Sequence, residues 1–589
     1  MSQPNLSSVN YKQSILGNEW VLSNFDENEL KAVQTKYSLS DLTLKILLNR
    51  GINKTNIESF LDVTLKKNIP DPNLLKDMAV SVDRIIEALT KKEKIGIIGD
   101  YDVDGIVSSS ILFKYLTFFE DNVIVRIPDR VTDGYGPNQK IIDEFKDQGV
   151  NLIITVDCGT SSNEIFKNNS NFDFIVIDHH QVTEINNRIS MINPNRDDDK
   201  SGLGYLCAAG VVFLTLVALN TKLREKNYYL KENIQEPSIL QYLPLVSMAT
   251  VADIVPLINL NRSIVTQGLK AIKKFPNLGM NAISEISNLT DDISYNDFGY
   301  VFGPRINAGG RIGHSSMGFT LLTSTDNRKA RELAERLDNL NTERKFLEEN
   351  STNEAIQLYQ DKFLYDKFIV LESKDWHPGI IGLIASRLSS RYNKPCFIIS
   401  NTSENLQTGS ARSVYGIDVG FIISELIKAR IIHEGGGHEM AAGFKIKREK
   451  IDELRAFLNS RTWCDDTKIK KNKFFDATLM ASAVTIQLIE EINSVGPYGN
   501  SFEEPKFLFP AHKIKNLTMI NNQHISLNLI DKNNFYLKGI SFRSVGTPLG
   551  SFLVEHSYKS LNFYGGLNIN RWGGNIKPQL IIEDVELIE

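Results

Sequence analysis

The chain has 589 residues, of which 42% are hydrophobic and 23% are charged, and its formal net charge is -5. This length exceeds what one hydrophobic core supports and predicts roughly three or four domains, with the composition of an ordinary soluble globular protein. The negative charge gives no global sign of a nucleic-acid-binding protein, so any phosphate binding must come from local clusters of Arg and Lys.

The N-terminal stretch MSQPNLSSVNYKQSIL has neither a basic start followed by an apolar segment nor a cleavage site. No stretch approaches the roughly 18 to 20 unbroken apolar residues of a membrane span. The cysteines Cys158, Cys207, Cys396 and Cys464 are scattered and form no C-x-x-C pair, which is typical of reduced thiols. We therefore expect a cytoplasmic protein that does not contact membranes.

From about residue 94 to 260, short apolar strands alternate with helical stretches. The strands are predicted at KIGIIGD, NVIVRIPD, NLIITVD and FDFIVIDHH. Such alternation predicts an α/β domain with a doubly wound parallel sheet. The strongly apolar stretches 206–220 and 239–254 are long enough to be buried helices.

A long helix and two further domains are predicted in the second half of the chain. The stretch from Asp326 to about Gln360 lacks Gly and Pro, and its leucines recur at helical spacing, which predicts a long connecting helix. A second α/β region follows over 364–460, with strands at KFIVLES and CFIIS and glycine-rich turns at QTGSARS and HEGGGHEMAAGF. After Asn472, short strands such as HISLNLI and FYLKGISF predict a small β-barrel or sandwich.

Residues of types that can bind metal ions follow three of the predicted strands. These residues are Asp100, Asp102, Asp104, Asp157, Asp178, His179 and His180. The C-terminal ends of neighbouring strands in an open α/β sheet face one crevice, so these side chains can converge. A further carboxylate, Asp253, interrupts the apolar stretch SMATVADIV. Burying it unpaired would cost several kcal/mol, which favours a partner or a metal ion.

Such a group of carboxylates with an imidazole predicts a centre for divalent cations. The carboxylates would repel one another unless cations were present, and oxygen ligands with a His suit Mn²⁺ or Mg²⁺. Two such ions about 4 Å apart would activate a water and stabilise a phosphoryl transition state. The predicted chemistry is hydrolysis of a phosphoester or a phosphoanhydride.

Three glycine-rich stretches predict phosphate binding. Glycines let the backbone approach a phosphate closely, and Arg binds it with two hydrogen bonds. The predicted residues are Arg305, Asn307 and Arg311 in GPRINAGGRIGH and Ser410, Arg412 and His438 in GSARS and GGGH. If one lobe carries the metal ions and the other an anion pocket, the cleft between them fits a single extended strand and excludes a duplex.

The region after residue 472 interleaves basic and aromatic side chains, as a stacking platform for single strands does, although the core of a barrel also contains aromatics. The residues are Lys513, Lys515, Arg543, Lys559, Arg571 and Lys577 with Tyr536, Phe542, Tyr558, Phe563, Tyr564 and Trp572.

The motifs DYDVDG, VDCG around Asp157, DHH at 178–180 and TVAD ending at Asp253 resemble, in order, spacing and strand context, the motifs of the DHH phosphoesterase superfamily. Within it, the chain resembles the RecJ family of single-strand-specific 5′ to 3′ exonucleases through LLNRGI, RVTDGYGPN, GPRINAGGRIG, DWHPGIIGLIASRL, GSARS and GGGHEMAAGF. VGPYGNSFEEPKF at 495–507 resembles that family's entry into an OB domain, although it departs from the usual Gly-x-Gly-Asn-Pro-Glu-Pro form.

The resemblance implies five parts. They are an N-terminal helical segment (1–60), a DHH catalytic domain (61–320), a long connecting helix (321–362), a DHHA1-like domain (363–465) and an OB-like β-barrel (466–589). It also implies the metal ligands Asp102, Asp104, Asp157, His179 and Asp253, with Asp157 bridging two ions and Asp100 as an additional ligand. His180 would contact the scissile phosphate, and either it or a water at the metal centre would handle the proton.

By the same resemblance, a 5′ end would be recognised by Arg130, Tyr135, Ser410 and Arg412. The function implied is a Mn²⁺- or Mg²⁺-dependent exonuclease that degrades single-stranded DNA from the 5′ end to mononucleotides in repair and recombination. A single-strand-binding protein and a RecQ-type helicase are the partners that it implies.

Two other functions fit parts of the sequence. A phosphodiesterase or pyrophosphatase acting on short oligonucleotides or small phosphoanhydrides could use the same catalytic lobe, but the region after residue 472 favours a polymer substrate. A replication scaffold with a decayed DHH lobe would not need the intact set of Asp and His ligands.

Overall fold

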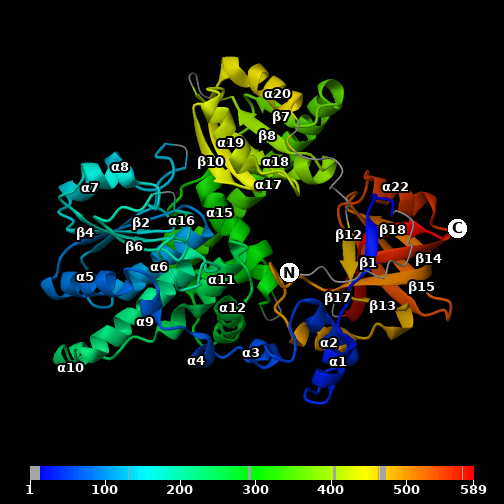
Figure 1. Ribbon diagram of the computed structural model, residues 1–589, viewed down its shortest axis with the longest axis horizontal. Coiled ribbons are helices and arrows are strands. Elements are labelled where there is room, and N and C mark those ends of the chain that lie inside the picture. The colour runs from blue at the N-terminus through cyan, green and yellow to red at the C-terminus, as the bar shows by residue number, and fades with distance from the viewer. Residues whose placement is uncertain are drawn as a thin grey trace. The chain divides into compact units, whose positions relative to one another are not determined.

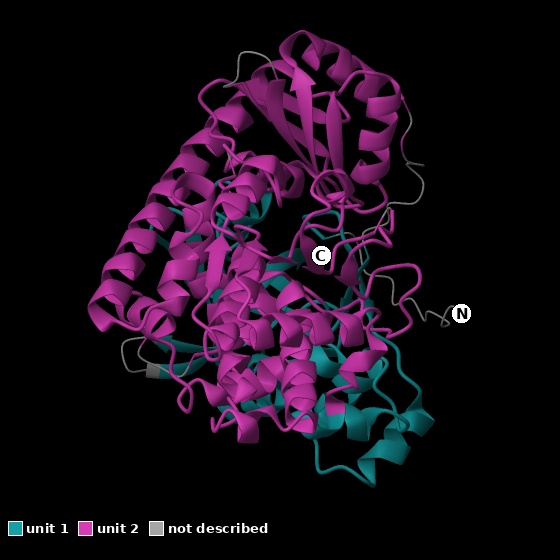
Figure 2. Cartoon of the chain, turned by 90° about the vertical axis from the view of Figure 1, so that its left-hand side faces the viewer, with its two compact units in different colours: residues 1–67, 256–262, 469–589 teal, residues 68–255, 263–468 magenta. Residues whose placement is uncertain are grey.

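The structure is a computed structural model, and it describes residues 14–130, 132–182, 184–289, 293–401, 406–461, 463, 472–572 and 575–588. Two compact units are distinguished by their internal contacts (Figure 2). Unit 1 comprises residues 1–67, 256–262 and 469–589, and unit 2 comprises residues 68–255 and 263–468. Within the described ranges, no helix combines the length and the apolar character needed to span a membrane.

Unit 2 contains the predicted doubly wound parallel sheet, which is confirmed. The elements are α5 (Met78–Lys91), β2 (Ile95–Gly99), α6 (Val103–Leu116), β3 (Val123–Arg126), α7 (Gln139–Asp147), β4 (Leu152–Val156), α8 (Asn163–Asn168), β5 (Asp173–Ile177), β6 (Ser190–Ile192) and α9 (Ala208–Glu225). The strand order is β3-β2-β4-β5-β6, and every neighbouring pair is parallel. Helices α7 and α8 lie on one face and α5 and α6 on the other (Figure 1). Strands β2 and β4 are buried throughout, as strands covered on both faces are.

The two predicted apolar helices are present as α9 and α11, and further helices complete this part of unit 2. The bounds are α10 (Tyr228–Lys231), α11 (Leu243–Ala252), α12 (Asn259–Ala271, which begins in unit 1), α13 (Leu278–Ile286), α14 (Tyr295–Asp297), a π turn (Phe298–Phe302), α15 (Gly303–Ile312) and α16 (Met317–Thr323). The glycine-rich stretch GPRINAGGRI is therefore a helix. Its glycines serve close packing, because a Cβ added at Gly310 would lie 2.6 Å from the carbonyl oxygen of Tyr101.

The predicted long helix is α17 (Asn327–Lys362), which has 36 residues. Asp326 caps its N-terminus by accepting a hydrogen bond from the backbone N–H of Lys329. Ala330, Ala334 and Leu337 are buried along one face. The helix thus packs through an apolar stripe, and farther along it Arg344 and Glu348 are buried as an ion pair.

The second α/β region holds a mixed sheet in the order β10-β11-β9-β8-β7. The bounds are β7 (Ile369–Ser373), α18 (Ile381–Tyr392), β8 (Cys396–Ser400), β9 (Leu406–Arg412), α19 (Val419–Lys428), β10 (Glu434–His438), β11 (Ala441–Lys447) and α20 (Ile451–Ser460). The prediction of a turn at QTGSARS was wrong, because this stretch belongs to β9. The stretch HEGGGHEMAAGF forms β10 and β11 and contains the turn at Glu439 and Met440 that joins them. Gly409 is a strand residue that makes room for a core side chain, since a Cβ there would lie 2.2 Å from the Phe444 ring.

Unit 1 contains the predicted β-barrel. Its strands run in the order β13-β14-β15-β16-β18-β17, and pairing of β14 with β17 closes the barrel. The bounds are β12 (Asn472–Phe475), β13 (Ala477–Thr478), α21 (Ile486–Ser494), β14 (Lys506–Ile520), β15 (His524–Ile530), β16 (Tyr536–Ser541), α22 (Pro548–Glu555), β17 (Ser560–Trp572) and β18 (Asn575–Leu587). Phe507, Phe509 and Phe563 fill its interior.

The N-terminal residues belong to the same unit. Where the sequence predicted only helices, a strand precedes them, and the bounds are β1 (Glu19–Leu22), α1 (Glu27–Gln34), α2 (Asp41–Asn49), α3 (Ile57–Leu61) and α4 (Leu65–Asn68). Strand β1 pairs in parallel with β12. The buried carboxylate of Asp584 in β18 accepts hydrogen bonds from Ser14, Asn18 and Trp20, so both ends of the described chain are joined at one acceptor.

Candidate metal centre

The metal-binding residues predicted from the sequence lie at one edge of the parallel sheet. Asp100, Asp157 and Asp178 directly follow β2, β4 and β5, which are neighbours in that sheet. Asp102 caps helix α6, and its carboxylate accepts hydrogen bonds from the N–H groups of Asp104 and Gly105. The sequence folds in this way because short apolar strands end at polar residues at the carboxyl edge of the sheet.

The side chains form three groups in which the ligand atoms lie within 4.8 Å of one another. The groups are Asp157, His179 and His180; Asp104, His179 and Asp253; and Asp100, Asp102 and Asp157. Asp157 and His179 each belong to two groups. The structure therefore brings together all six residues that the family resemblance implies as metal ligands, whereas Asp178 belongs to none of these groups.

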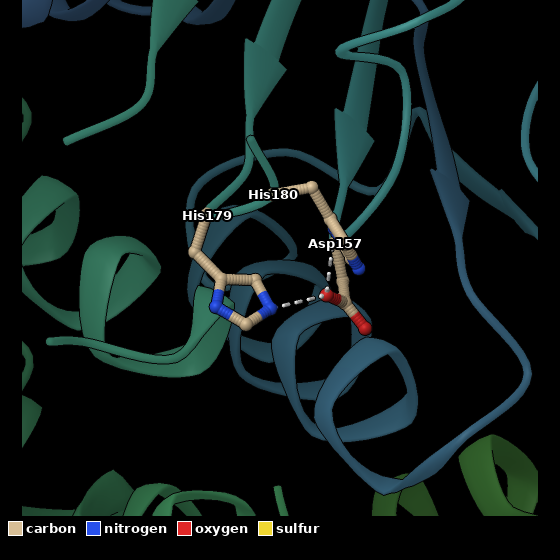
Figure 3. Close-up of side chains that lie close together, drawn as sticks. All are labelled: Asp157, His179 and His180. Carbon is tan, nitrogen blue, oxygen red and sulfur yellow. Dashed lines mark ion pairs between the residues drawn. The ribbon is translucent and has the colours of Figure 1, made fainter. Parts of the chain in front are cut away.

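His179 lies at the middle of this cluster, and Figure 3 shows its ring beside the carboxylate of Asp157. Its Nε2 atom is 3.4 Å from Oδ1 of Asp157, 3.7 Å from Oδ2 of Asp253 and 3.8 Å from Oδ2 of Asp104. These distances are longer than those of typical hydrogen bonds. A cation bound by the four atoms would account for their spacing.

The buried carboxylates fit a cation site. Within the described part of the chain, Oδ1 of Asp100 and Oδ1 of Asp157 are buried and accept no hydrogen bond. Burial, and then the charges of neighbouring carboxylates, raise the pKa values of Asp100 and Asp157 well above the usual range. Asp157 also has a φ of 60°, a left-handed conformation that is uncommon for a residue with a side chain. Divalent cations would offset both the missing hydrogen bonds and the mutual repulsion, so the donor set suits Mn²⁺ or Mg²⁺.

Asp104 is held from behind by another helix. Its two carboxylate oxygens accept hydrogen bonds from the backbone N–H groups of Ala208 and Ala209, at 2.6 and 2.9 Å. These groups lie at the N-terminus of α9, where unpaired N–H groups and the helix dipole favour a negative charge. The carboxylate is thereby fixed with its remaining acceptor capacity directed at His179.

Asp178 orients the two histidines. Its Oδ1 accepts hydrogen bonds from the backbone N–H of His179, at 2.7 Å, and of His180, at 3.2 Å, and lies 2.7 Å from Nδ1 of His180. Burial favours a higher pKa of Asp178, but the hydrogen bond and the charge of His180 outweigh burial and lower this pKa below its usual value. Burial likewise opposes the charged form of His180, but the carboxylate of Asp178 raises the pKa of His180 to about 9.

Three residues that sequence reasoning missed complete this support. Thr160 donates its hydroxyl hydrogen to Oδ2 of Asp178. Asn193 donates to the Thr160 hydroxyl and to the His180 carbonyl, and Asn195 donates to the His179 carbonyl. The motif NPN at 193–195 was the available signal, because two amides flanking a Pro after an apolar strand suggest a rigid polar turn.

The predicted phosphate-binding residues of α15 separate into different roles. The guanidinium group of Arg305 forms an ion pair with Asp338 of α17 and donates to the Val301 carbonyl, so it braces two helices. The side-chain oxygen of Asn307 accepts from the N–H of Val103 and thus supports the start of α6. These partners lie far apart in the sequence, so the composition of the stretch could not reveal them.

Arg311 lies where the two lobes of unit 2 meet. It donates to the carbonyl of Gly379, which precedes α18. Burial, and then neighbouring guanidinium groups that include Arg130 and Arg412, lower the pKa of Arg311 to about 10. Burial and Arg130 also lower the pKa of Arg412. Like charges that depress one another's pKa values form a positive field suited to a phosphate.

The other residues predicted to bind a 5′ end lie around this field. Arg412 donates to the hydroxyl oxygen of Ser410, and a Cβ added at Gly382 would lie 3.0 Å from the Arg412 guanidinium group. The hydroxyl of Tyr135 donates to the Asp157 carbonyl and lies 3.4 Å from Nδ1 of His180. The Arg130 guanidinium carbon lies 4.5 Å from the centre of the Tyr101 ring. His438 ends the exposed edge strand β10, and no contact given by the structure joins it to the metal-binding residues.

Only part of the predicted stacking platform is available on the barrel of unit 1. Phe563 and Tyr564 are buried and belong to hydrophobic cores, so the prediction was wrong for these two residues. Tyr536, Phe542 and Tyr558 are exposed, and the ammonium group of Lys515 lies over the Tyr536 ring. The side chain of Trp572 lies outside the described atoms.

Three family models match consecutive parts of the chain. The DHH family N-terminal domain matches residues 94–250, the DHHA1 domain matches residues 361–463, and the RecJ OB domain matches residues 475–584. The first match covers β2 to α11 and so contains most of the cluster described above.

Curated proteins resemble the chain over most of its length. The single-stranded-DNA-specific exonuclease RecJ of Haemophilus influenzae is 32% identical over 563 residues, which cover 92% of this chain and 96% of that protein. The RecJ of Bacillus subtilis is 29% identical over 582 residues and covers 97% of this chain, which spans 71% of that protein.

Solved structures share the fold. The crystal structure of Thermus thermophilus RecJ in complex with Mn²⁺ has a TM-score of 0.76 at 23% identity, and the match covers 96% of this chain and 79% of that chain. A crystal structure of exonuclease RecJ bound to manganese has a TM-score of 0.55 at 28% identity, and the match covers 66% of this chain and 94% of that chain.

Proposed function

Because the chain belongs to the RecJ family of single-stranded-DNA-specific exonucleases, we propose that it hydrolyses single-stranded DNA from the 5′ end to mononucleotides with Mn²⁺ or Mg²⁺. The observation that carries this proposal is the convergence of Asp104, Asp157, His179 and Asp253 around unpaired carboxylate oxygens. A decayed lobe that served only as a scaffold would have no reason to keep this costly arrangement.

The chain's own residues hold the cations and the phosphate. Asp102, Asp104, His179 and Asp253 would hold the cations, together with Asp157, which belongs to two of the three groups of ligand atoms, and Asp100. When bound, the two cations would make a water more acidic and stabilise the charge that develops on the phosphate. His180, charged through its pairing with Asp178, donates a hydrogen bond to a non-bridging phosphate oxygen or a proton to the leaving oxygen.

Basic residues from both lobes of unit 2 hold the end of the strand. Arg130, Arg311 and Arg412 create a positive field next to the acidic cluster in the same unit. A terminal phosphate held there places the adjoining phosphodiester at the metal ions, which supports removal of one nucleotide at a time. The choice of the 5′ end is proposed from the family.

The cellular setting is proposed on the same basis. An exonuclease of this family would work in the cytoplasm in DNA repair and recombination, on strands opened by a RecQ-type helicase and covered by a single-strand-binding protein. The exposed aromatic and basic residues of the barrel, such as Tyr536 and Lys515, support a long single-stranded substrate.

The test is digestion of a single-stranded oligonucleotide that carries its label at either the 5′ or the 3′ end, with Mn²⁺, with Mg²⁺ and with EDTA. The proposal expects immediate release of a labelled mononucleotide from the 5′-labelled strand only, with no digestion of a blunt duplex and none in EDTA. Release from the 3′ end, or hydrolysis of pyrophosphate and dinucleotides but not of long DNA, would contradict it and favour the small-substrate phosphodiesterase.

A further inference from the structure

We infer that Ile254 is a substrate-contact residue, whose side chain packs against the nucleoside at the scissile phosphate of the bound strand. The inference rests on the proposed exonuclease function and adds an apolar contact to the metal ligands and arginines. It comes from an unusual backbone conformation at a residue that directly follows a metal-binding side chain.

The backbone of Ile254 is strained. Helix α11 ends with Asp253 as its C-cap, and Ile254 follows with a φ of 57° while its N–H donates to the Val251 carbonyl. Gly or Asn usually occupies such a left-handed position after a helix. Ile254 is the only β-branched residue among the non-glycine residues with positive φ in the described ranges, and its branched side chain makes this conformation a genuine outlier.

Little burial offsets this strain. The side chain of Ile254 is large and apolar, yet 70% of the residue's surface is exposed. A Gly would relieve the backbone at little loss of buried apolar surface. Residues held in unfavourable conformations cluster where function needs them.

The position of Ile254 identifies that function. It directly follows Asp253, whose Oδ2 lies 3.7 Å from Nε2 of His179, and consecutive Cα atoms are only about 3.8 Å apart. Ile254 therefore lies next to a residue of the metal-binding cluster, where a phosphodiester held by that cluster would bring its sugar and base. Those groups have apolar faces, which an aliphatic side chain can cover without reading the base. Such a contact suits an enzyme that removes every nucleotide in turn.

The left-handed conformation also ends helix α11 at this place. The C-cap fixes the carboxylate of Asp253 towards His179, and the turn at the next residue prevents Ile254 from continuing the helix into the core, where its preceding neighbours Ala249 and Thr250 are buried. Metal ligand and apolar contact are thereby provided by adjacent residues.

The experiment compares Ile254→Gly with Lys92→Gly in steady-state digestion of single-stranded DNA and in thermal unfolding. Lys92 is an exposed residue with a φ of 55° after α5. It precedes β2 and therefore lies at the edge of the sheet opposite to the metal-binding residues. Its variant measures the effect of relieving a left-handed backbone conformation away from the cluster. We expect Ile254→Gly to raise KM about tenfold, with kcat within twofold and a Tm no lower than that of the wild type. Lys92→Gly should leave KM and kcat unchanged.

A second variant separates side-chain chemistry from backbone strain. Ile254→Asn keeps a side chain that tolerates the left-handed conformation but removes the apolar contact, so its KM should rise as in Ile254→Gly. A KM within twofold of the wild type in both variants, or a Tm of Ile254→Gly below the wild-type value, would overturn the inference. A wild-type protein that does not degrade DNA would instead refute the proposed function.

Discussion

The Nε2 atom of His179 lies 3.4 Å from Oδ1 of Asp157, an oxygen that accepts no hydrogen bond from any residue the structure describes. The two side chains are shared by neighbouring groups of metal-binding residues. A buried carboxylate in this setting destabilises the protein until a cation binds beside it, so metal binding and stability are coupled.

Asp157→Asn should reveal this coupling. Without metal, the variant removes a buried charge, and we expect its Tm to equal or exceed that of the wild type. Millimolar Mn²⁺ should raise the Tm of the wild type by several degrees and leave that of the variant almost unchanged, while exonuclease activity falls at least a hundredfold. Thermal unfolding in EDTA and in Mn²⁺ measures this, and an equal metal-induced shift in both proteins would contradict it.

Asp104→Asn should lose both activity and stability. An amide can accept only one of the two hydrogen bonds from Ala208 and Ala209, and its NH₂ group would face the second N–H. We expect a loss of about 1 to 3 kcal/mol in the free energy of unfolding, measured by urea denaturation without metal. Asp253→Asn is the matched control, because it removes another carboxylate facing His179 without affecting these bonds. It should abolish activity at nearly wild-type stability.

Arg305 and Arg311, although six positions apart on α15, should behave differently. Arg305→Ala breaks the ion pair with Asp338 and should destabilise the protein by about 2 kcal/mol with little change in KM. Asp338→Asn should have a similar effect, and the double variant should lose little more than either single variant. Arg311→Ala should raise KM for single-stranded DNA at least tenfold, because it removes a guanidinium group from the positive field. A larger KM change in Arg305→Ala than in Arg311→Ala would contradict these assignments.

His512 should make the stability of unit 1 depend on pH. Its Nε2 accepts a hydrogen bond from the N–H of Ala481, and burial lowers the pKa of His512 below the ordinary value of 6.5. The folded state therefore keeps the ring neutral, whereas the unfolded chain takes up a proton as the pH falls through about 6.5. The contribution to stability is complete above this pH and declines below it.

His512→Gln keeps an acceptor for Ala481 but cannot be protonated. The Tm of the wild type should fall more between pH 7.5 and pH 5 than the Tm of this variant. Equal slopes in the two proteins would show that His512 does not cause the dependence.

The sequence predicted the parts of the fold that depend on local patterns. The Ile-rich runs before Asp100 and Asp178 indicated buried strands, and the leucine spacing after Asp326 indicated the long helix. The cluster could be predicted because its members follow neighbouring strands, so topology alone brings them to one edge. Asp253 was detectable as a charge within an apolar stretch.

Residues whose role depends on a distant partner could not be assigned in this way. Arg305 among glycines has the pattern of an anion-binding loop, and only its pairing with Asp338 shows that it braces two helices. The glycines around Ser410 suggested turns, whereas in the structure Gly409 gives space to Phe444 across a sheet. Composition records how flexible a segment is, but not which side chain fills the space that a glycine leaves.

The hydrogen bond between Ser14 and Asp584 spans 570 positions, which has a consequence for synthesis on the ribosome. The residues of unit 2 that carry the catalytic cluster are complete once the chain has passed residue 468, and domains generally fold as units in the order of their synthesis. Ser14 and Asn18 are translated before unit 2, whereas their acceptor Asp584 is translated after it. In a nascent chain stopped before β18, unit 2 would therefore be complete and able to fold. The N-terminal strand and helices would still lack the strand of the barrel that carries Asp584.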